Sequence, residues 1–187
     1  MSDFDPAGTG FSIGSWNAGV RYLKGTGFPE GVISAPVGST YIDTAITNGA
    51  SSWIKKSGTG NTGWQVLEGD TGWRNIASLI NTTDFSGTNF KIRRVNNQVE
   101  LIGDLGANTL SAERELTSNF ALFTGFKANS AVWDRQGLVN VGGTSMVGYI
   151  KVGDNFKALF TGATQNRFRV SFSTTDAWPT TLPGVSA

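Results

Sequence analysis

One short segment combines an aromatic residue with charged and amide side chains, at Trp133, Asp134, Arg135 and Gln136. Sugar rings present apolar C–H faces to an aromatic platform and hydroxyl groups to polar neighbours, so this composition is typical of a shallow glycan-binding site. The alternative is an ordinary core tryptophan beside polar residues. The segment therefore predicts either a sugar platform or a piece of the core.

Arginines gather at two places in the chain, at Arg93–Arg94 and at Arg167 with Arg169. On adjacent strands they would form a basic strip that binds an anionic polymer, such as a phosphorylated glycan, through charge-assisted hydrogen bonds. The alternative is a solvated outer face whose alkyl stems cover the sheet. The formal net charge is only +1, which gives no electrostatic case for binding nucleic acid or an acidic membrane.

Catalytic groups are scarce. The chain has no His and no Cys, which removes the usual general base, the commonest metal ligand and thiolate chemistry. Most carboxylates stand in predicted turns, where Asp caps its own backbone, and no spacing selects a pair for glycoside hydrolysis. No apolar run approaches the ~18 residues of a membrane span, so no membrane insertion is expected. We expect no enzyme activity, no catalytic residue, no metal and no cofactor.

The elements that position these residues read as short strands. Glycine supplies 25 of 187 residues, and 12 Phe and six Trp supply apolar surface, which favours an all-β protein with many tight turns. A turn at Asn96–Asn97 would form a hairpin that pairs Ile92 with Leu101 and Arg93 with Glu100.

More strands are predicted in the second half of the chain. The segments Met146–Val152 and Phe156–Phe160 flank a three-residue turn, and Arg167–Ser173 alternates apolar with polar residues. Only Ser111–Leu116 reads as helical. Strands at this spacing predict a β-sandwich, jelly-roll-like head over residues 76–187.

A Gly-Asn/Asp-Thr-Gly-Trp repeat occurs at Gly60–Trp64 and again at Gly69–Trp73. Two glycine turns of the same chemistry would bracket one short strand. Residues 28–75 contain few aliphatic side chains and cannot easily close a core alone. We therefore predict a glycine- and tryptophan-rich β segment packing around a threefold axis, with its tryptophans facing the axis or a sister chain: Trp53, Trp64 and Trp73.

The stretch from Glu30 to Arg74 resembles minor tail and receptor-binding proteins of tailed bacteriophages, most of all those that infect Actinobacteria. The resemblance returns at Thr174–Gly184 (TTDAWPTTLPG) and near Lys91–Leu101. It implies an intertwined homotrimer of the virion tail, with residues 1–27 as a leader that docks onto tail adaptor or baseplate proteins. In this frame Trp178 is a structural latch.

The resulting expectation is an adhesin of the phage tail, made in the cytoplasm of the bacterial host. Its head would bind a bacterial cell-wall or surface polysaccharide, and weak contacts would gain strength from several copies. Two alternatives stay open. One is a structural capsid fibre or decoration protein, and the other is a cell-wall glycan depolymerase.

Overall fold

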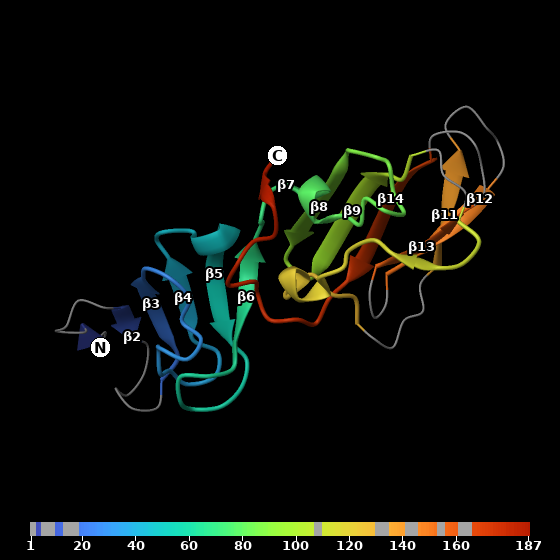
Figure 1. Cartoon of the computed structure of the whole chain (residues 1–187). Helices are drawn as coiled ribbons and strands as arrows, with labels where there is room; N and C mark the ends of the chain where they lie inside the picture. Colours follow the sequence, from blue (N-terminus) through green and yellow to red (C-terminus); the bar gives the residue numbers. More distant parts are fainter. Residues whose placement is uncertain are drawn as a thin grey trace. The chain divides into compact units, whose positions relative to one another are not determined.

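The computed structural model describes residues 3–4, 10–12, 19–106, 110–129, 135–140, 146–152, 156–160 and 166–187. Across these residues the regular structure is β-strand, with no α-helix and only short 3-10 turns: η1 (Thr47–Gly49), η2 (Ala77–Leu79) and η3 (Phe120–Phe123). The all-β class expected from the sequence is confirmed. The chain divides into two compact units, Met1–Asp70 and Thr71–Ala187 (Figure 1).

The first unit contains one mixed sheet with its strands in sequence order (Figure 1). The strands are β1 (Asp3–Phe4), β2 (Gly10–Ser12), β3 (Arg21–Gly25), β4 (Thr40–Asp43), β5 (Ala50–Lys55) and β6 (Trp64–Gly69). Neighbours are antiparallel except β3 and β4, which run parallel with Tyr22 opposite Thr40. Residues 21–25 of the predicted leader therefore belong to the same sheet as the tryptophan-rich segment.

One face of this sheet is covered by the connection 26–39 between β3 and β4. Trp53 is 3% exposed and its ring lies 5.2 Å from the ring of Phe28, centroid to centroid. Trp64 is 5% exposed, and its indole N–H donates to the Ile33 carbonyl at 2.8 Å. Burial of both rings needs no sister chain, which removes the reason for placing them at a threefold axis.

A lysine is buried beneath the loop between β5 and β6. The Lys55 side chain donates from Nζ to the Gly60 carbonyl at 2.7 Å and to the Thr62 carbonyl. The same ammonium lies 5.6 Å from the centroid of the Trp64 ring. Because Lys55 is almost fully buried, these carbonyls replace the water that its charge would otherwise bind.

Strand β4 ends where the Asp43 carboxylate accepts three backbone N–H groups. The donors are Gly27 at 2.9 Å, Ala45 at 2.9 Å and Thr47 at 2.8 Å. Burial raises the pKa of Asp43, and the hydrogen bonds from Thr47, Ala45 and Gly27 lower it. The hydrogen bonds together have the larger effect, so the pKa lies below the ordinary 3.8.

Because the folded pKa of Asp43 is depressed, its contribution to stability is complete above pH 3.8 and declines as the pH falls through the folded pKa. We expect Asp43→Asn to lower the free energy of unfolding at pH 7 by about 2 kcal/mol. The cost should shrink as the pH falls below 3.8, because the carboxyl of the unfolded chain is protonated there and the native carboxyl is protonated at its own lower pKa. Urea midpoints at pH 7 and pH 3 test this, with the exposed Glu68→Gln as control. An equal cost at both pH values would contradict the assignment.

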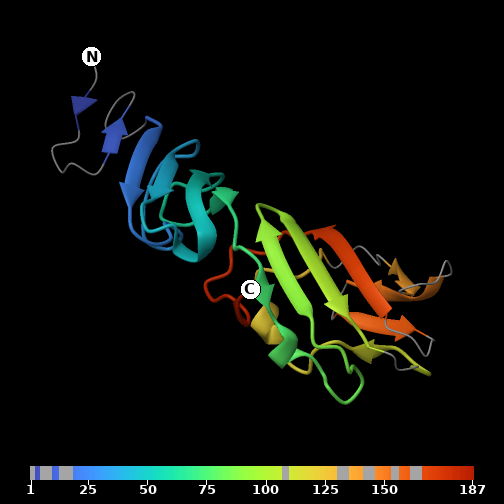
Figure 2. The ribbon, with the colours of Figure 1, turned by 90° about the horizontal axis from the view of Figure 1, so that it is seen from above.

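The second unit contains one antiparallel sheet in the order β10-β13-β12-β11-β14-β9-β8-β7-β15. Figure 2 shows β8, β9 and β14 of this sheet side by side. Its strands are β7 (Arg74–Asn75), β8 (Phe90–Val95), β9 (Gln98–Asp104), β10 (Arg114–Glu115), β11 (Arg135–Asn140), β12 (Met146–Lys151), β13 (Lys157–Phe160), β14 (Asn166–Ser173) and β15 (Val185–Ser186). β14 pairs with β9 along seven positions and joins the two halves of the sheet.

The predicted registers in this unit are confirmed. Ile92 pairs with Leu101 and Arg93 with Glu100 across the β8–β9 hairpin. The predicted helix at Ser111–Leu116 is wrong, because residues 114–115 form β10 against β13. A segment this short lacks the length to offset helix nucleation, and its charges are held by ion pairs to neighbouring segments instead.

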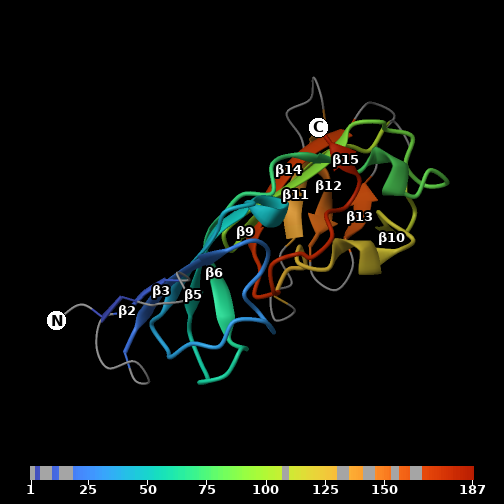
Figure 3. The same cartoon turned by 90° about the vertical axis from the view of Figure 1, so that its left-hand side faces the viewer.

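The core of the second unit is rich in phenylalanine and draws on both halves of the sheet. Phe156 lies 5.9 Å from Phe172 of β14, and Phe160 of β13 lies 6.4 Å from Phe85, measured between ring centroids. All four belong to one continuous buried cluster. The inner face of the sheet is therefore occupied by core packing, which leaves the outer face as the candidate binding surface. Figure 3 shows strands β11, β12 and β14 of this sheet.

Candidate functional site

The outer face of strands β8, β9 and β14 gathers charged and polar side chains. Ile92 and Leu101 point inward and are fully buried, so alternation turns their neighbours outward. One outward row runs from Arg93 through Glu100 to Ser171, as the strand registers show. We refer to the row Arg93–Glu100–Ser171, the row Lys91–Ile102–Arg169 and the adjoining Trp73 as the outer face.

Carboxylates balance two of the arginines on this side of the sheet. The Arg169 guanidinium contacts Glu100, with Nη2 at 2.5 Å and Nε at 3.2 Å from Oε1. Arg167 Nε lies 3.6 Å from Asp104 Oδ2. The side chains of Arg167 and Arg169 are more than half exposed, so these pairs orient the guanidinium groups and add little stability.

An aromatic side chain stands beside the charged rows. Trp73 directly precedes β7, is half-buried, and has the Arg93 guanidinium 6.0 Å from its ring centroid. The Trp73 carbonyl accepts the backbone N–H of Ala187 at 3.1 Å, which fixes the main chain at this point. A continuous series of side chains crosses from β7 to β14, which is roughly 14 Å at ordinary strand spacing. Its members are Trp73, Arg93, Glu100 and Arg169. An aromatic ring next to oriented polar groups has the composition of a sugar-binding surface.

The predicted arginine strip does not form as expected. Arg93 faces outward, but Arg94 lies in the inward row with Val99 and Phe172 and is only 5% exposed. Arg167 and Arg169 do share the outer side with Arg93, separated by carboxylates. The structure thus gives an alternating charge pattern in place of a continuous basic strip.

The buried Arg94 side chain holds the C-terminal segment. Its guanidinium donates to the carbonyls of Asn96 at 2.7 Å, Ala177 at 2.9 Å and Asp176 at 3.0 Å, and to that of Gly125. It also lies 4.9 Å from the centroid of the buried Trp178 ring. Burial lowers the pKa of Arg94 to about 10, and the neighbouring Asp176 opposes that shift.

The residues predicted as a sugar platform fall mostly outside the described part of the chain. Trp133 and Asp134 lie outside the described residues. Arg135 and Gln136 begin β11, opposite Lys151 and Ile150 of β12. The outer face takes its aromatic residue from Trp73 instead, which sequence reasoning assigned to a threefold axis.

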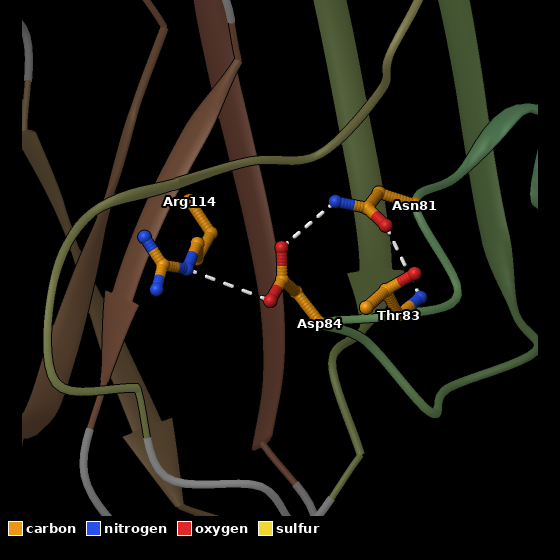
Figure 4. A network of polar contacts seen from close by, with 4 residues as sticks. All are labelled: Asn81, Thr83, Asp84 and Arg114. Carbon is orange, nitrogen blue, oxygen red and sulfur yellow. Dashed lines mark hydrogen bonds and ion pairs between the residues drawn. The ribbon is translucent and has the colours of Figure 1, made fainter.

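Several of the described carboxylates have structural partners of their own. Asp84 accepts Asn81 Nδ2 at 2.8 Å and lies 3.5 Å from Arg114 Nε, which holds the turn after η2 against β10 (Figure 4). Glu113 accepts the hydroxyl of Tyr149 at 2.7 Å. Within the described ranges, no group of three or more His, Cys, Asp or Glu residues is arranged to hold a metal ion.

A groove lies on the second unit, and no residue of the charged rows is in its lining. It encloses about 410 Å³ between η3 and the C-terminal segment, and its lining is mainly apolar, with three threonines. Leu122 of η3 is 45% exposed at this groove. The groove gives a matched position for testing whether the outer face is the binding surface.

Comparisons of the chain with protein-family models, with curated proteins and with solved structures return no match. Among the described residues, no helix is both long and apolar enough to cross a membrane.

Proposed function

We propose that this protein is an attachment protein of a tailed bacteriophage virion and that it binds a bacterial cell-surface glycan. The resemblance of residues 30–74 to phage tail proteins supports the class of protein. The outer face supports the mode of action, because Trp73 and Arg93 stand beside the oriented Glu100–Arg169 pair. In this proposal the second unit is a sandwich-like head, and the binding is non-covalent.

The single observation that carries the binding proposal is the pairing of Trp73 with Arg93 at one end of the charged rows. An aromatic side chain that is only half-buried leaves part of its ring available for the C–H face of a sugar. Arg93, Glu100 and Arg169 supply donors and acceptors for hydroxyl groups. Because Glu100 and Asp104 offset two arginines, this face fits an uncharged or weakly acidic glycan better than a polyphosphate.

We expect Trp73→Ala to weaken binding of fluorescently labelled protein to intact host cells about tenfold, equivalent to ~1.4 kcal/mol. The matched control is Leu122→Ala, an exposed apolar residue of the same unit that lines the separate groove. Saturable labelling that is lost when wall glycans are stripped would support the proposal. If Leu122→Ala alone lowered binding, the groove and not the outer face would be the site.

A second candidate function is a structural role in the virion, as a capsid fibre or decoration protein. The observation that favours it is the set of exposed apolar residues on the first unit, which include Tyr22, Ile42 and Leu67. Such residues mark a surface for assembly. Absence of labelling across a panel of hosts, with the protein recovered from purified tailless capsids, would favour this role over attachment.

A further inference from the structure

The first sheet has a second face, opposite the one covered by the connection 26–39. Residues paired across neighbouring strands share a face, so the registers define which side chains lie there. One row contains Tyr22, Thr40, Ile54 and Gln65, and the next contains Lys24, Ile42, Ser52 and Glu68. We call these two rows the open face.

The open face exposes large apolar side chains. Tyr22 is 50% exposed and Ile42 is 49% exposed, whereas Tyr41 on the covered face is 2% exposed. A solvated face of a β-sheet ordinarily carries polar residues at such positions. Exposed apolar residues grouped on one sheet face indicate a surface that meets another molecule.

The charges of the open face stand at its two sides. Lys24 is on β3 and Glu68 is on β6, and both belong to the same row, because Lys24 pairs with Ile42, Ile42 with Ser52 and Ser52 with Glu68. Three strand spacings separate the two charged residues, roughly 14 Å. A single chain therefore cannot pair them with each other, although both are exposed.

We propose that the open face docks onto the open face of a second copy of this chain around a twofold axis. With the axis parallel to the strands and between β4 and β5, the rotation brings β3 of one copy over β6 of the other. Lys24 of each copy then faces Glu68 of its partner copy, and Tyr22 faces Gln65 of its partner copy. Ile42 and Ile54, which are on the two middle strands, lie over the middle strands of the partner copy. Packed sheets lie about 10 Å apart, a gap that a lysine and a glutamate side chain span together.

The size of the open face sets the strength of this contact. Two rows across four strands cover much less than the ~800 Å² per partner of a standard stable interface. The pair should therefore be weak and reversible in solution, and it becomes effective where several copies are held together, as in a virion. This inference concerns the first unit and does not depend on glycan binding by the second.

Sedimentation equilibrium of the full chain from about 10 μM to 1 mM tests the proposal, a range that spans weak protein association. The mass should rise from 19.8 kDa toward twice that value. Lys24→Glu and Glu68→Lys should each raise the dissociation constant at least ~10-fold, because each variant places like charges opposite each other. The double variant Lys24→Glu/Glu68→Lys should return to within ~3-fold of the wild type, because both ion pairs are re-formed with exchanged charges.

The control is Lys127→Glu, which makes the same charge change on a lysine of the second unit and should leave the dissociation constant unchanged. Circular dichroism of each variant separates loss of folding from loss of association. A constant monomer mass over the whole range, a three-copy mass or a double variant that stays dissociated would each overturn the twofold pairing. Cell labelling by a dissociated variant would show that glycan binding is a separate property.

Discussion

Arg94→Met is expected to lower the free energy of unfolding of the second unit by about 3 kcal/mol. A methionine side chain has a similar length but cannot donate a hydrogen bond. The substitution therefore removes the donor shared by four carbonyls, those of Asn96, Gly125, Asp176 and Ala177. The full sum of these hydrogen bonds would be larger. Part of it is offset in the wild type by the cost of burying a charge, which is visible in the lowering of the Arg94 pKa to about 10.

The neighbouring arginine provides the matched control for this variant. Arg93→Met alters the next residue on the outward side of the same strand and should change the free energy of unfolding by less than ~0.5 kcal/mol. Thermal unfolding should show a fall in the melting temperature of about 10 °C for Arg94→Met only. Arg93→Met should instead weaken cell labelling, because it removes the partner of Trp73. Equal melting temperatures for both variants would show that water satisfies the freed carbonyls.

Lys55→Met is expected to cost the first unit about 2–3 kcal/mol. The substitution leaves the Gly60 and Thr62 carbonyls without the donor that ties them down. It also removes the cation from the Trp64 ring. The loop between β5 and β6 should consequently open more often than in the wild type.

Limited proteolysis at residues 56–63 measures that opening, and tryptophan fluorescence in urea measures the loss of stability. Lys56→Met is the matched control, because Lys56 is the next residue and is exposed. We expect its cleavage rate and urea midpoint to remain those of the wild type. Faster cleavage in both variants would mean that general loss of charge, and not the buried ammonium, loosens the loop.

Local patterns in the sequence were sufficient to predict the hairpins. The β8–β9 register follows from a turn at Asn96–Asn97, where Asn96 adopts a positive φ of 51°. The alternation of β14 places Phe168, Val170 and Phe172 in the core, as expected. These features depend on residues close in sequence, whose periodicity is visible without a structure.

Long-range contacts were not predictable in the same way. The alternation that buries Phe90 and Ile92 also points Arg94 inward, a signal that was available in the sequence. The carbonyls that accept hydrogen bonds from Arg94, at Gly125, Asp176 and Ala177, are distant in sequence, and no sequence pattern predicts these contacts. The cover over Trp53 and Trp64 likewise comes from an irregular connection without periodicity.

The same difference applies to the candidate site. Arg167 and Arg169 were correctly assigned to an outer side by alternation, but their carboxylate partners sit on another strand. Trp73 was singled out as a structural residue, and only its position beside Arg93 points to a role in binding. A sequence rich in tryptophan indicates which residues could bind a sugar, but it does not show which side chains lie next to them in the fold.

The parallel pairing of β3 with β4 has a consequence for the order of events during folding. The hairpin β5–β6 closes a short loop, whereas β3 reaches β4 only after the connection 26–39 has been ordered. Contacts that close longer loops cost more chain entropy and tend to form later. Tyr22 and Lys24 belong to β3, so the open face is complete only when β3 has paired with β4, in the final stage of folding. A newly made chain would therefore reach its own folded state before it presents a surface to which another copy can bind, which separates folding in time from assembly.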